Sequence, residues 1–200
     1  MKKNFVSVLI TNYNKSAYLK NTINSCLIQN FKNKEILVFD DCSTDNSLKI
    51  LRKFKNIKVI KNKNKKFKSG PLNQIYGLSQ LFKISKGNII FLLDSDDIFK
   101  KNKIFEINKI FEKNKKINFI QDTPLENFYK KKITFKEKKH FFSIWPSFYP
   151  TSCIAIKRSF FEDFLKILKG NKFPNLEVDA RLSIYAYIKN QFFVTKKCLT

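Results

Sequence analysis

Short apolar runs alternate with amphipathic stretches along the first half of the chain. Each run is rich in Val, Ile, Leu or Phe and stops at a polar residue, which is typical of buried strands. Between the runs, apolar residues recur at intervals of three and four, and this spacing predicts helices. We therefore expect strands at 5–10, 35–39, 57–60 and 88–93, in alternation with three helices.

Residues that favour helix ends mark these three helices. Ser16 is expected to be the N-cap of the first helix, and the segment 43–45 supplies capping side chains for the second. Pro71 suits the first turn of the third helix, which is expected to run to about Ser85. Gly87 is expected to be the C-terminal cap of that helix.

The second half of the chain has a weaker pattern. A basic stretch at 130–139 is expected to be a loop, and the segment 145–150 is an aromatic loop. Packing is the default role for these aromatic side chains, and a stacking platform for a sugar is the alternative. The other expected elements are a helix at 104–111, strands at 117–120 and 152–156, and helices at 160–168 and 176–188.

Alternation of strands and helices is the pattern of an α/β fold, with a mainly parallel sheet that has helices on both faces. The carboxyl ends of parallel strands meet at one edge, where open α/β sheets bind ligands. Thr11 ends the first predicted strand, Asp40 and Asp41 follow the second, and the acidic segment 94–97 follows the fourth. We expect these polar groups to line one crevice.

Asp94, Asp96 and Asp97 form the densest cluster of acids in the chain. Three carboxylates that repel one another gain nothing for folding, but they suit a divalent cation, because Mg²⁺ and Mn²⁺ prefer oxygen ligands. A solvated acidic turn is the alternative. The only histidine is His140, which argues against a histidine-based metal site and against Ser-His-Asp catalysis.

The composition is that of one folded domain. The 200 residues are 43% hydrophobic and include 22 Phe, with no internal repeat and no linker. No apolar run approaches the roughly 20 residues of a membrane-spanning helix. The four cysteines lack Cys-x-x-Cys spacing, so free thiols in a reducing cytoplasm are expected.

The net charge of +24 raises nucleic acid and anionic membrane as partners. Only three of the 40 basic residues are arginines, and base readout relies on bidentate arginine, so the composition argues against nucleic acid. Weak peripheral contact with acidic lipid headgroups stays open, and it would place the protein at the inner face of the membrane.

Five blocks of the first 100 residues, in this order, resemble the family 2 glycosyltransferases. This resemblance implies a GT-A (Rossmann-like) fold, a nucleotide-sugar donor that is usually a UDP-sugar, and Mg²⁺ or Mn²⁺. It also implies one domain over 1–200, with a donor half at 1–100 and an acceptor half at 101–200. The blocks are Val6–Asn14, Gln29–Phe31, Glu35–Ser47, Asn73 and Gly87–Asp97.

The resemblance also implies roles for single residues. Thr11 would lie beside the nucleoside, Tyr13 would line its pocket, and Asp41 would accept a hydrogen bond from the uracil N–H. A cap or Asx turn is the alternative for Asp41, and packing is the alternative for Tyr13. Asp96 and Asp97 match the metal and diphosphate ligands of the family's Asp-x-Asp motif. Asp94 would support the ribose or the same metal.

An inverting reaction also needs a base that takes the proton of the acceptor hydroxyl. By resemblance, Asp179 matches the family's catalytic aspartate at the start of a late helix, and Glu177 is the alternative. A helix N-terminus favours an acid by itself, so Asp179 has a structural alternative as well. Val178 and Leu72 depart from the family pattern, in which an acid and a basic residue usually stand at these positions.

The sequence thus predicts an inverting glycosyltransferase that moves a sugar to a hydroxyl of a cell-surface glycan or a lipid-linked precursor. A catalytically inactive module that binds nucleotide sugars or glycans is the alternative. Many relatives continue further beyond the position of Asp179, so we expect a minimal or truncated enzyme.

Overall fold

A seven-stranded sheet forms the centre of the computed structural model, which describes residues 4–128, 131–134, 148–168 and 172–200. The strand order is β3-β2-β1-β4-β8-β5-β9. The strands are β1 (Val6–Asn12), β2 (Lys34–Asp40), β3 (Lys58–Lys61), β4 (Ile89–Asp94), β5 (Phe119–Thr123), β8 (Ile154–Lys157) and β9 (Phe192–Cys198).

The four strands of the N-terminal half are parallel, as the alternating pattern predicts. β1 pairs with both β2 and β4, and β3 pairs with β2. β8 runs antiparallel to its neighbours β4 and β5, and β9 is parallel to β5. The register aligns Asn12 with Asp40 and Thr11 with Asp94, so the ends of β1, β2 and β4 share one edge.

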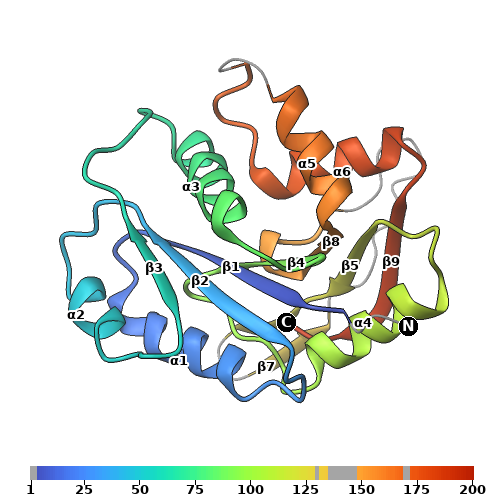
Figure 1. The fold of residues 1–200 in the computed structure, drawn as a ribbon, viewed down its shortest axis with the longest axis horizontal. Coiled ribbons are helices and arrows are strands. Elements are labelled where there is room, and N and C mark those ends of the chain that lie inside the picture. Colours follow the sequence, from blue (N-terminus) through green and yellow to red (C-terminus); the bar gives the residue numbers. More distant parts are fainter. Residues whose placement is uncertain (1–3, 129–130, 135–147, 169–171) are drawn as a thin grey trace.

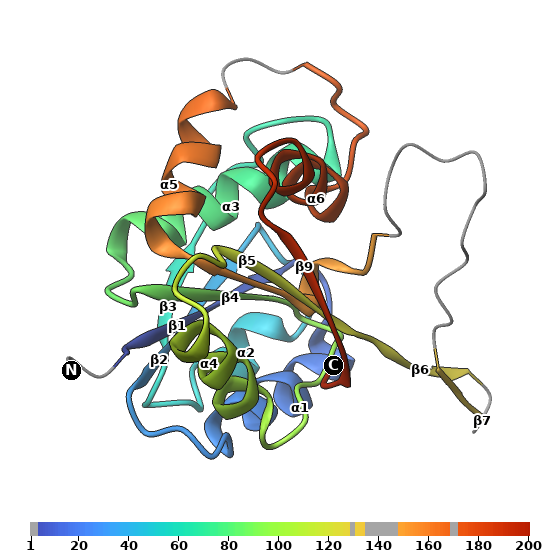
Figure 2. The same ribbon diagram turned by 90° about the vertical axis from the view of Figure 1, so that its right-hand side faces the viewer.

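Helices cover both faces of the sheet (Figures 1 and 2). One face packs against α1 (Ser16–Leu27), α2 (Ser47–Leu51) and α4 (Lys103–Lys113), and the other against α3 (Gly70–Ile84), α5 (Arg158–Ile167) and α6 (Val178–Ile188). Val8 of β1 faces the first group and Leu9 the second. Because both faces are buried, the central strands β2 and β4 have unbroken apolar runs at 36–39 and 89–93.

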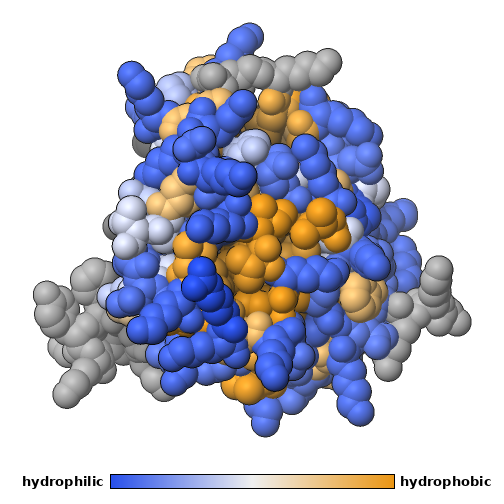
Figure 3. Space-filling model, turned by 60° about the vertical axis from the view of Figure 1, so that its left-hand side comes forward, coloured by the Kyte–Doolittle hydropathy of each residue, from blue (hydrophilic) through white to orange (hydrophobic). Residues whose placement is uncertain are grey.

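Smaller elements complete the described chain. A 3₁₀ turn, Thr151–Cys153, leads into β8. A separate antiparallel pair, β6 (Leu125–Phe128) and β7 (Lys131–Thr134), projects from the body (Figure 2). No helix in the described ranges combines the length and the apolar character that a bilayer crossing requires. In Figure 3, apolar side chains gather on one face within a hydrophilic frame.

Most of the predicted elements exist, with shifted ends. The predicted strand at 117–120 begins at Phe119 as β5, and the one at 152–156 begins at Ile154 as β8. Neither β9 nor the β6–β7 pair was predicted. His140, the loop expected at 130–139 apart from 131–134, and the aromatic loop up to residue 147 lie outside the described residues.

Two predicted caps are wrong. Ser16 is the first residue of α1 and not its N-cap, which is Lys15. The carboxylate of Asp45 instead accepts a hydrogen bond from the backbone N–H of Ser16 at 2.8 Å, and one from that of Ser47 at 2.9 Å. A single acid thus satisfies backbone donors at the starts of both α1 and α2.

Gly87 is not the cap of α3, because that helix ends at Ile84 and its C-cap is Ser85. The reason for a glycine at position 87 is its close approach to β1. A Cβ at this position would lie 2.4 Å from the backbone nitrogen of Ser7 and 2.8 Å from the carbonyl carbon of Val6. The N–H of Gly87 also donates to the hydroxyl of Ser7 at 2.8 Å. A larger residue would force the entry to β4 away from β1.

Gly87→Ala is therefore expected to lower the free energy of unfolding by about 1–3 kcal/mol, because backbone atoms cannot yield to the added methyl group. Gly70→Ala is the control, since nothing lies within 4 Å of a Cβ at that position. Urea denaturation of both variants measures the difference. Equal stabilities would contradict the assigned role of Gly87.

Candidate functional site

A cavity of about 420 Å³ opens at the carboxyl ends of β1, β2 and β4. Its wall brings together residues that are far apart in the sequence. They include all five residues that we predicted to contact the donor: Thr11, Tyr13, Asp41, Asp94 and Asp96. Three lysines, Lys15, Lys65 and Lys68, share the wall with these carboxylates, and the ammonium of Lys65 lies 3.5 Å from the centre of the Tyr13 ring.

The adjacent acids at the end of β2 have different surroundings. Asp40 is fully buried and accepts hydrogen bonds from the amide of Asn12 at 2.8 Å and from the backbone N–H of Ser43 at 3.1 Å. Asp40 therefore has the structural role of closing the turn. Asp41 lines the cavity and accepts a hydrogen bond from the amide of Asn62 through Oδ1 at 2.8 Å. The arrangement leaves Asp41 as the acceptor that a ligand can reach.

The loop around these acids holds unusual backbone conformations. Asn14 and Cys42 have positive φ angles of 52° and 60°. Asparagine tolerates this region, and the side chain of Asn14 accepts a hydrogen bond from the N–H of Thr44 at 2.8 Å. Cys42 has no such preference, so its conformation costs energy that the surrounding hydrogen bonds must offset. Strain of this kind is common beside binding sites.

Asp94 lies where negative charge is most concentrated. Burial raises the pKa of its carboxyl group to about 7, and the charges of Asp97, Asp96, Asp179 and Glu177 act in the same direction. The amide of Gln74 donates to Asp94 at 2.6 Å and also contacts the hydroxyl of Thr11 at 3.3 Å. Gln74, on α3, thus joins β1 to β4 at the cavity. A glutamine within an amphipathic helix gives no sequence signal for this role.

Asp96 and Asp97 share one cavity, and Asp96 also lines another one. Asp96 lines the cavity and forms an ion pair with the ammonium of Lys15 at 2.6 Å. Asp97 lines a second cavity of about 620 Å³, in which Asp96 also takes part. Burial raises the pKa of Asp97, and the charge of Asp96 adds to this. A hydrogen bond with Ser152 and the charge of Lys103 oppose the increase.

The oxygen ligands at this site suit a cation that also binds the oxygens of a diphosphate. Among the residues that the structure describes, no three His, Cys, Asp or Glu side chains converge as a ready-made metal site. Yet the ammonium of Lys15 already stands beside Asp96 as a cation. Burial is the largest cause of the raised pKa of Asp94, and the charges of the neighbouring acids add to it. Mg²⁺ is commonly held by one or two carboxylates together with substrate phosphates, so this chemistry fits such an ion.

The two candidate bases lie at the start of α6. Asp179 is half-buried in the first turn, and its carboxylate accepts a hydrogen bond from the N–H of Ala180 at 2.6 Å. Burial raises its pKa, and hydrogen bonds with the backbone oppose that increase. Glu177 is exposed. Neither residue lines the 420 Å³ cavity. Both contribute charge at Asp94, so the start of α6 faces the acidic cluster.

Ser152 supports the backbone of the acidic turn at 94–97. Its hydroxyl accepts a hydrogen bond from the N–H of Asp94 at 2.9 Å. Its carbonyl accepts one from the ammonium of Lys103 at 2.7 Å, and Lys103 pairs with Asp122 at 2.5 Å. Thr200 completes this group through hydrogen bonds to Lys103 and Asp122. The side chains of Lys103 and Asp122 have no exposed surface, which the sequence did not indicate for a lysine-rich segment.

Lys103→Met is expected to lower the free energy of unfolding by about 3–5 kcal/mol, because it leaves the buried carboxylate of Asp122 without its cation. The double variant Lys103→Met/Asp122→Leu should recover a large part of this loss. Lys109→Met, at an exposed position of the same helix, is the control and should stay within about 0.5 kcal/mol of the wild type. Denaturant titrations that show no difference between the two lysine variants would contradict the assignment.

Comparison with known proteins adds a family and a fold. The family described as "Glycosyl transferase family 2" matches residues 7–165. An Escherichia coli protein named UDP-Glc:alpha-D-GlcNAc-diphosphoundecaprenol beta-1,3-glucosyltransferase is 38% identical over 98 residues. This match covers 49% of the present chain and 38% of that protein. The poly(ribitol-phosphate) beta-N-acetylglucosaminyltransferase TarS of Staphylococcus aureus is 32% identical over 97 residues, which are 48% of the chain and 17% of TarS.

Solved structures extend the likeness to nearly the whole chain. Residues 1–349 of TarS in complex with UDP superpose with a TM-score of 0.74 at 20% identity, over 98% of the chain and 59% of that structure. A Pyrobaculum calidifontis mannosyltransferase in complex with GDP-Man and Mn²⁺ superposes with a TM-score of 0.71 at 14% identity, over 98% of the chain and 56% of that structure. The predicted GT-A fold is confirmed. The chain spans only part of the length of these proteins.

Proposed function

The chain belongs to glycosyl transferase family 2, and on this premise we propose that it transfers a sugar from a nucleotide-sugar donor to a hydroxyl group of a glycan or a lipid-linked precursor. The observation that carries the proposal is the convergence of Thr11, Asp41, Asp94 and Asp96 on one cavity. The name of the Escherichia coli relative points to an acceptor of the lipid-linked class.

The proposed donor is a UDP-sugar. Asp41 lines the cavity as a hydrogen-bond acceptor, and uracil offers a ring N–H where cytosine offers none. Tyr13 is 44% exposed, and the ring face that Lys65 does not cover would pack against the nucleoside. The complex of TarS with UDP supports this choice, whereas the GDP-Man complex of the second neighbour means that the fold alone does not determine the base.

The diphosphate needs positive charge as the bond between the sugar and the phosphate oxygen breaks. We assign Asp96 and Asp97 to hold Mg²⁺ or Mn²⁺, which would stabilise the negative charge of the leaving nucleoside diphosphate. Lys15 is paired with Asp96, so it is positioned to contact the same phosphates. Lys65 and Lys68 also line the cavity and add to this charge. Mn²⁺ in the mannosyltransferase complex supports the assignment.

Inversion requires a base on the face of the sugar opposite the diphosphate. Asp179 is the better candidate because burial raises its pKa, which makes its carboxylate a stronger proton acceptor. It would take the proton of the acceptor hydroxyl while the oxygen attacks the anomeric carbon and the diphosphate departs. Glu177 stays the alternative base. The competing function is a binding module that has lost turnover, and it is motivated by the absence of both acids from the residues that line the cavity.

The location that we propose is the cytoplasm, at the inner face of the membrane. The four cysteines are free thiols, as a reducing compartment would maintain them. A lipid-linked acceptor would bring the substrate to the bilayer surface. This part of the proposal rests on the acceptor class and not on the donor cavity.

Asp96→Asn and Asp97→Asn are each expected to weaken UDP binding in the presence of Mn²⁺ by about ten- to a hundredfold, because the cation loses an oxygen ligand. Their affinities with a chelator present should match that of the wild type. Isothermal titration calorimetry measures both conditions, with the exposed Asp163→Asn as the control. Wild-type affinity that does not change on metal removal would argue against a metal-dependent donor site.

Asp179→Asn is expected to lower the rate of sugar transfer by about 10²–10⁴-fold while it retains UDP affinity, since only the proton acceptor is lost. Glu177→Gln should retain most of the activity. A transfer assay with a panel of UDP-sugars tests both. The reverse pattern would assign the base to Glu177. A wild type that binds UDP but turns over no donor would favour the binding module.

A further inference from the structure

Phe173 is presented to solvent in a conformation that a phenylalanine rarely adopts. Its side chain is 72% exposed, and its φ angle is 56°, in the left-handed region. An exposed aromatic ring forgoes burial, and a positive φ is unfavourable for a residue other than glycine. The exposed ring and the positive φ angle are both unfavourable, so the surrounding structure must stabilise this conformation of Phe173.

Hydrogen bonds hold the segment that carries Phe173. The guanidinium of Arg181 donates to the carbonyl oxygens of Lys172, Phe173 and Leu176. The N–H of Leu176 also donates to the carbonyl of Phe173 at 3.0 Å. One arginine thus fixes three carbonyl groups of the short loop 172–176, and the ring of Phe173 projects from a restrained support.

The segment 61–68, which is the last residue of β3 and the loop after it, lies beside the loop 172–176. The hydroxyl of Ser69 donates to the carbonyl of Pro174, which joins the start of α3 to the loop of Phe173. Five lysines occupy 61–68, and all are exposed. The chain has no Asp or Glu between Asp45 and Asp94, so no acid from that stretch neutralises them. Lys172 adds a further exposed charge next to Phe173.

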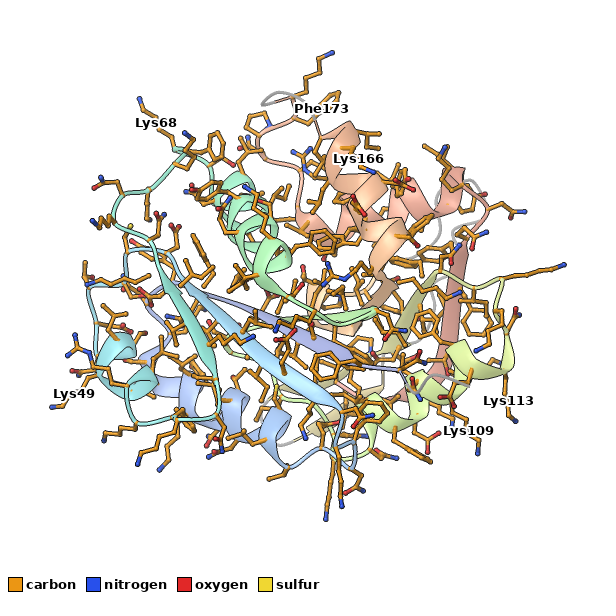
Figure 4. The ribbon with its side chains drawn as sticks, in the orientation of Figure 1. Lys49, Lys68, Lys109, Lys113, Lys166 and Phe173 are labelled. Atoms are coloured by element: carbon orange, nitrogen blue, oxygen red, sulfur yellow. The ribbon has the colours of Figure 1, made fainter. Side chains whose placement is uncertain are left out.

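Further apolar surface lies behind these loops. Ile167, at the end of α5, is 60% exposed. A hollow of about 310 Å³ lies between α3, α5 and α6, and it is lined by Phe67, Leu72 and Leu168 together with Arg181. In Figure 4, Lys68 and Phe173 lie along the upper edge of the molecule, whereas Lys109 and Lys113 lie on the opposite side. The basic and apolar groups therefore form one rim.

We propose that this rim, formed by the loops 61–68 and 172–176 with Ile167, docks on an anionic lipid bilayer. Phe173 and Ile167 would enter the headgroup region, and the lysines would contact the acidic headgroups. A bilayer suits this rim better than a nucleic acid does, because an aliphatic and an aromatic side chain stand exposed among lysines. Lysine also keeps its charge at the surface while its stem lies against apolar groups.

Docking of the rim would bring the donor cavity to the bilayer surface. Lys65 and Lys68 belong to the basic loop and also line that cavity. A lipid-linked acceptor would then meet the donor without leaving the membrane. This consequence rests on the proposed function, whereas the docking itself does not.

Phe173→Asn tests the inference, because asparagine tolerates the left-handed conformation and removes the ring. The matched control is Phe105→Asn, which changes a phenylalanine that is 47% exposed on α4, across the molecule. We expect Phe173→Asn to weaken binding to phosphatidylcholine vesicles that contain phosphatidylglycerol by about tenfold, and the control to leave it unchanged. Lys172→Gln should weaken binding about fivefold, and Lys113→Gln much less. Vesicle co-sedimentation measures all four variants.

A second measurement does not depend on a loss of binding. Phe173→Trp is made in a Trp145→Phe background, which removes the only natural tryptophan. A blue shift of the fluorescence on addition of the anionic vesicles, with quenching by brominated lipid, supports insertion at position 173. No shift, or equal losses for Phe173→Asn and Phe105→Asn, would overturn the proposal. Binding of DNA or RNA that is tighter than vesicle binding and is reduced by the same rim variants would also overturn it.

These outcomes can be distinguished from a failure of the proposed function. Vesicle binding that depends on Phe173 in a protein that turns over no donor leaves the docking surface in place and removes only the enzyme assignment. Turnover with a water-soluble acceptor, together with vesicle binding that ignores the rim, removes the docking surface and retains the enzyme.

Discussion

The carboxylates at one edge of the sheet repel one another, and the rest of this structure must hold them together. Parallel pairing of β1 with β2 and β4 brings the acids of two strand ends to one cavity. Burial and the charges of neighbouring acids raise the pKa of Asp94 to about 7. The fold keeps these carboxylates close although separation would lower their electrostatic energy. A bound cation with its diphosphate would make their proximity favourable.

The support beneath the acids is built to resist this repulsion. Ser152 fixes the backbone at Asp94 and contacts Asp97, and its own carbonyl is held by Lys103. The buried pair of Lys103 and Asp122 joins α4 to β5. Such a pair contributes little net stability, but loss of one partner is costly. Because Lys103 also binds the carbonyl of Ser152, the geometry of the acidic turn depends on contacts far from the cavity.

Local patterns were sufficient for the first half of the fold. β1, β2 and β4 are buried and largely apolar, and the apolar residues of the helices between them recur at helical spacing, so these elements could be predicted. β9 is a counterexample, because only one of its seven residues is buried and its apolar residues do not alternate with polar ones. Its pairing with β5 depends on contacts that no local pattern records. The same holds for Gly87, whose neighbour is the backbone of β1 and not the end of α3.

The sequence by itself determined which chemical groups stand at the strand ends, since Thr11, Asp41 and the acids at 94–97 follow directly from where the apolar runs stop. Only the tertiary structure decided how these groups divide their roles. It buried Asp40 in a turn, turned Asp97 toward a second cavity, and paired Asp96 with Lys15. Such partners lie tens of residues away in the sequence. Several lysines and acids have the same charge, and packing and distance decide which of them pair. Residue identity alone therefore does not predict the pairs.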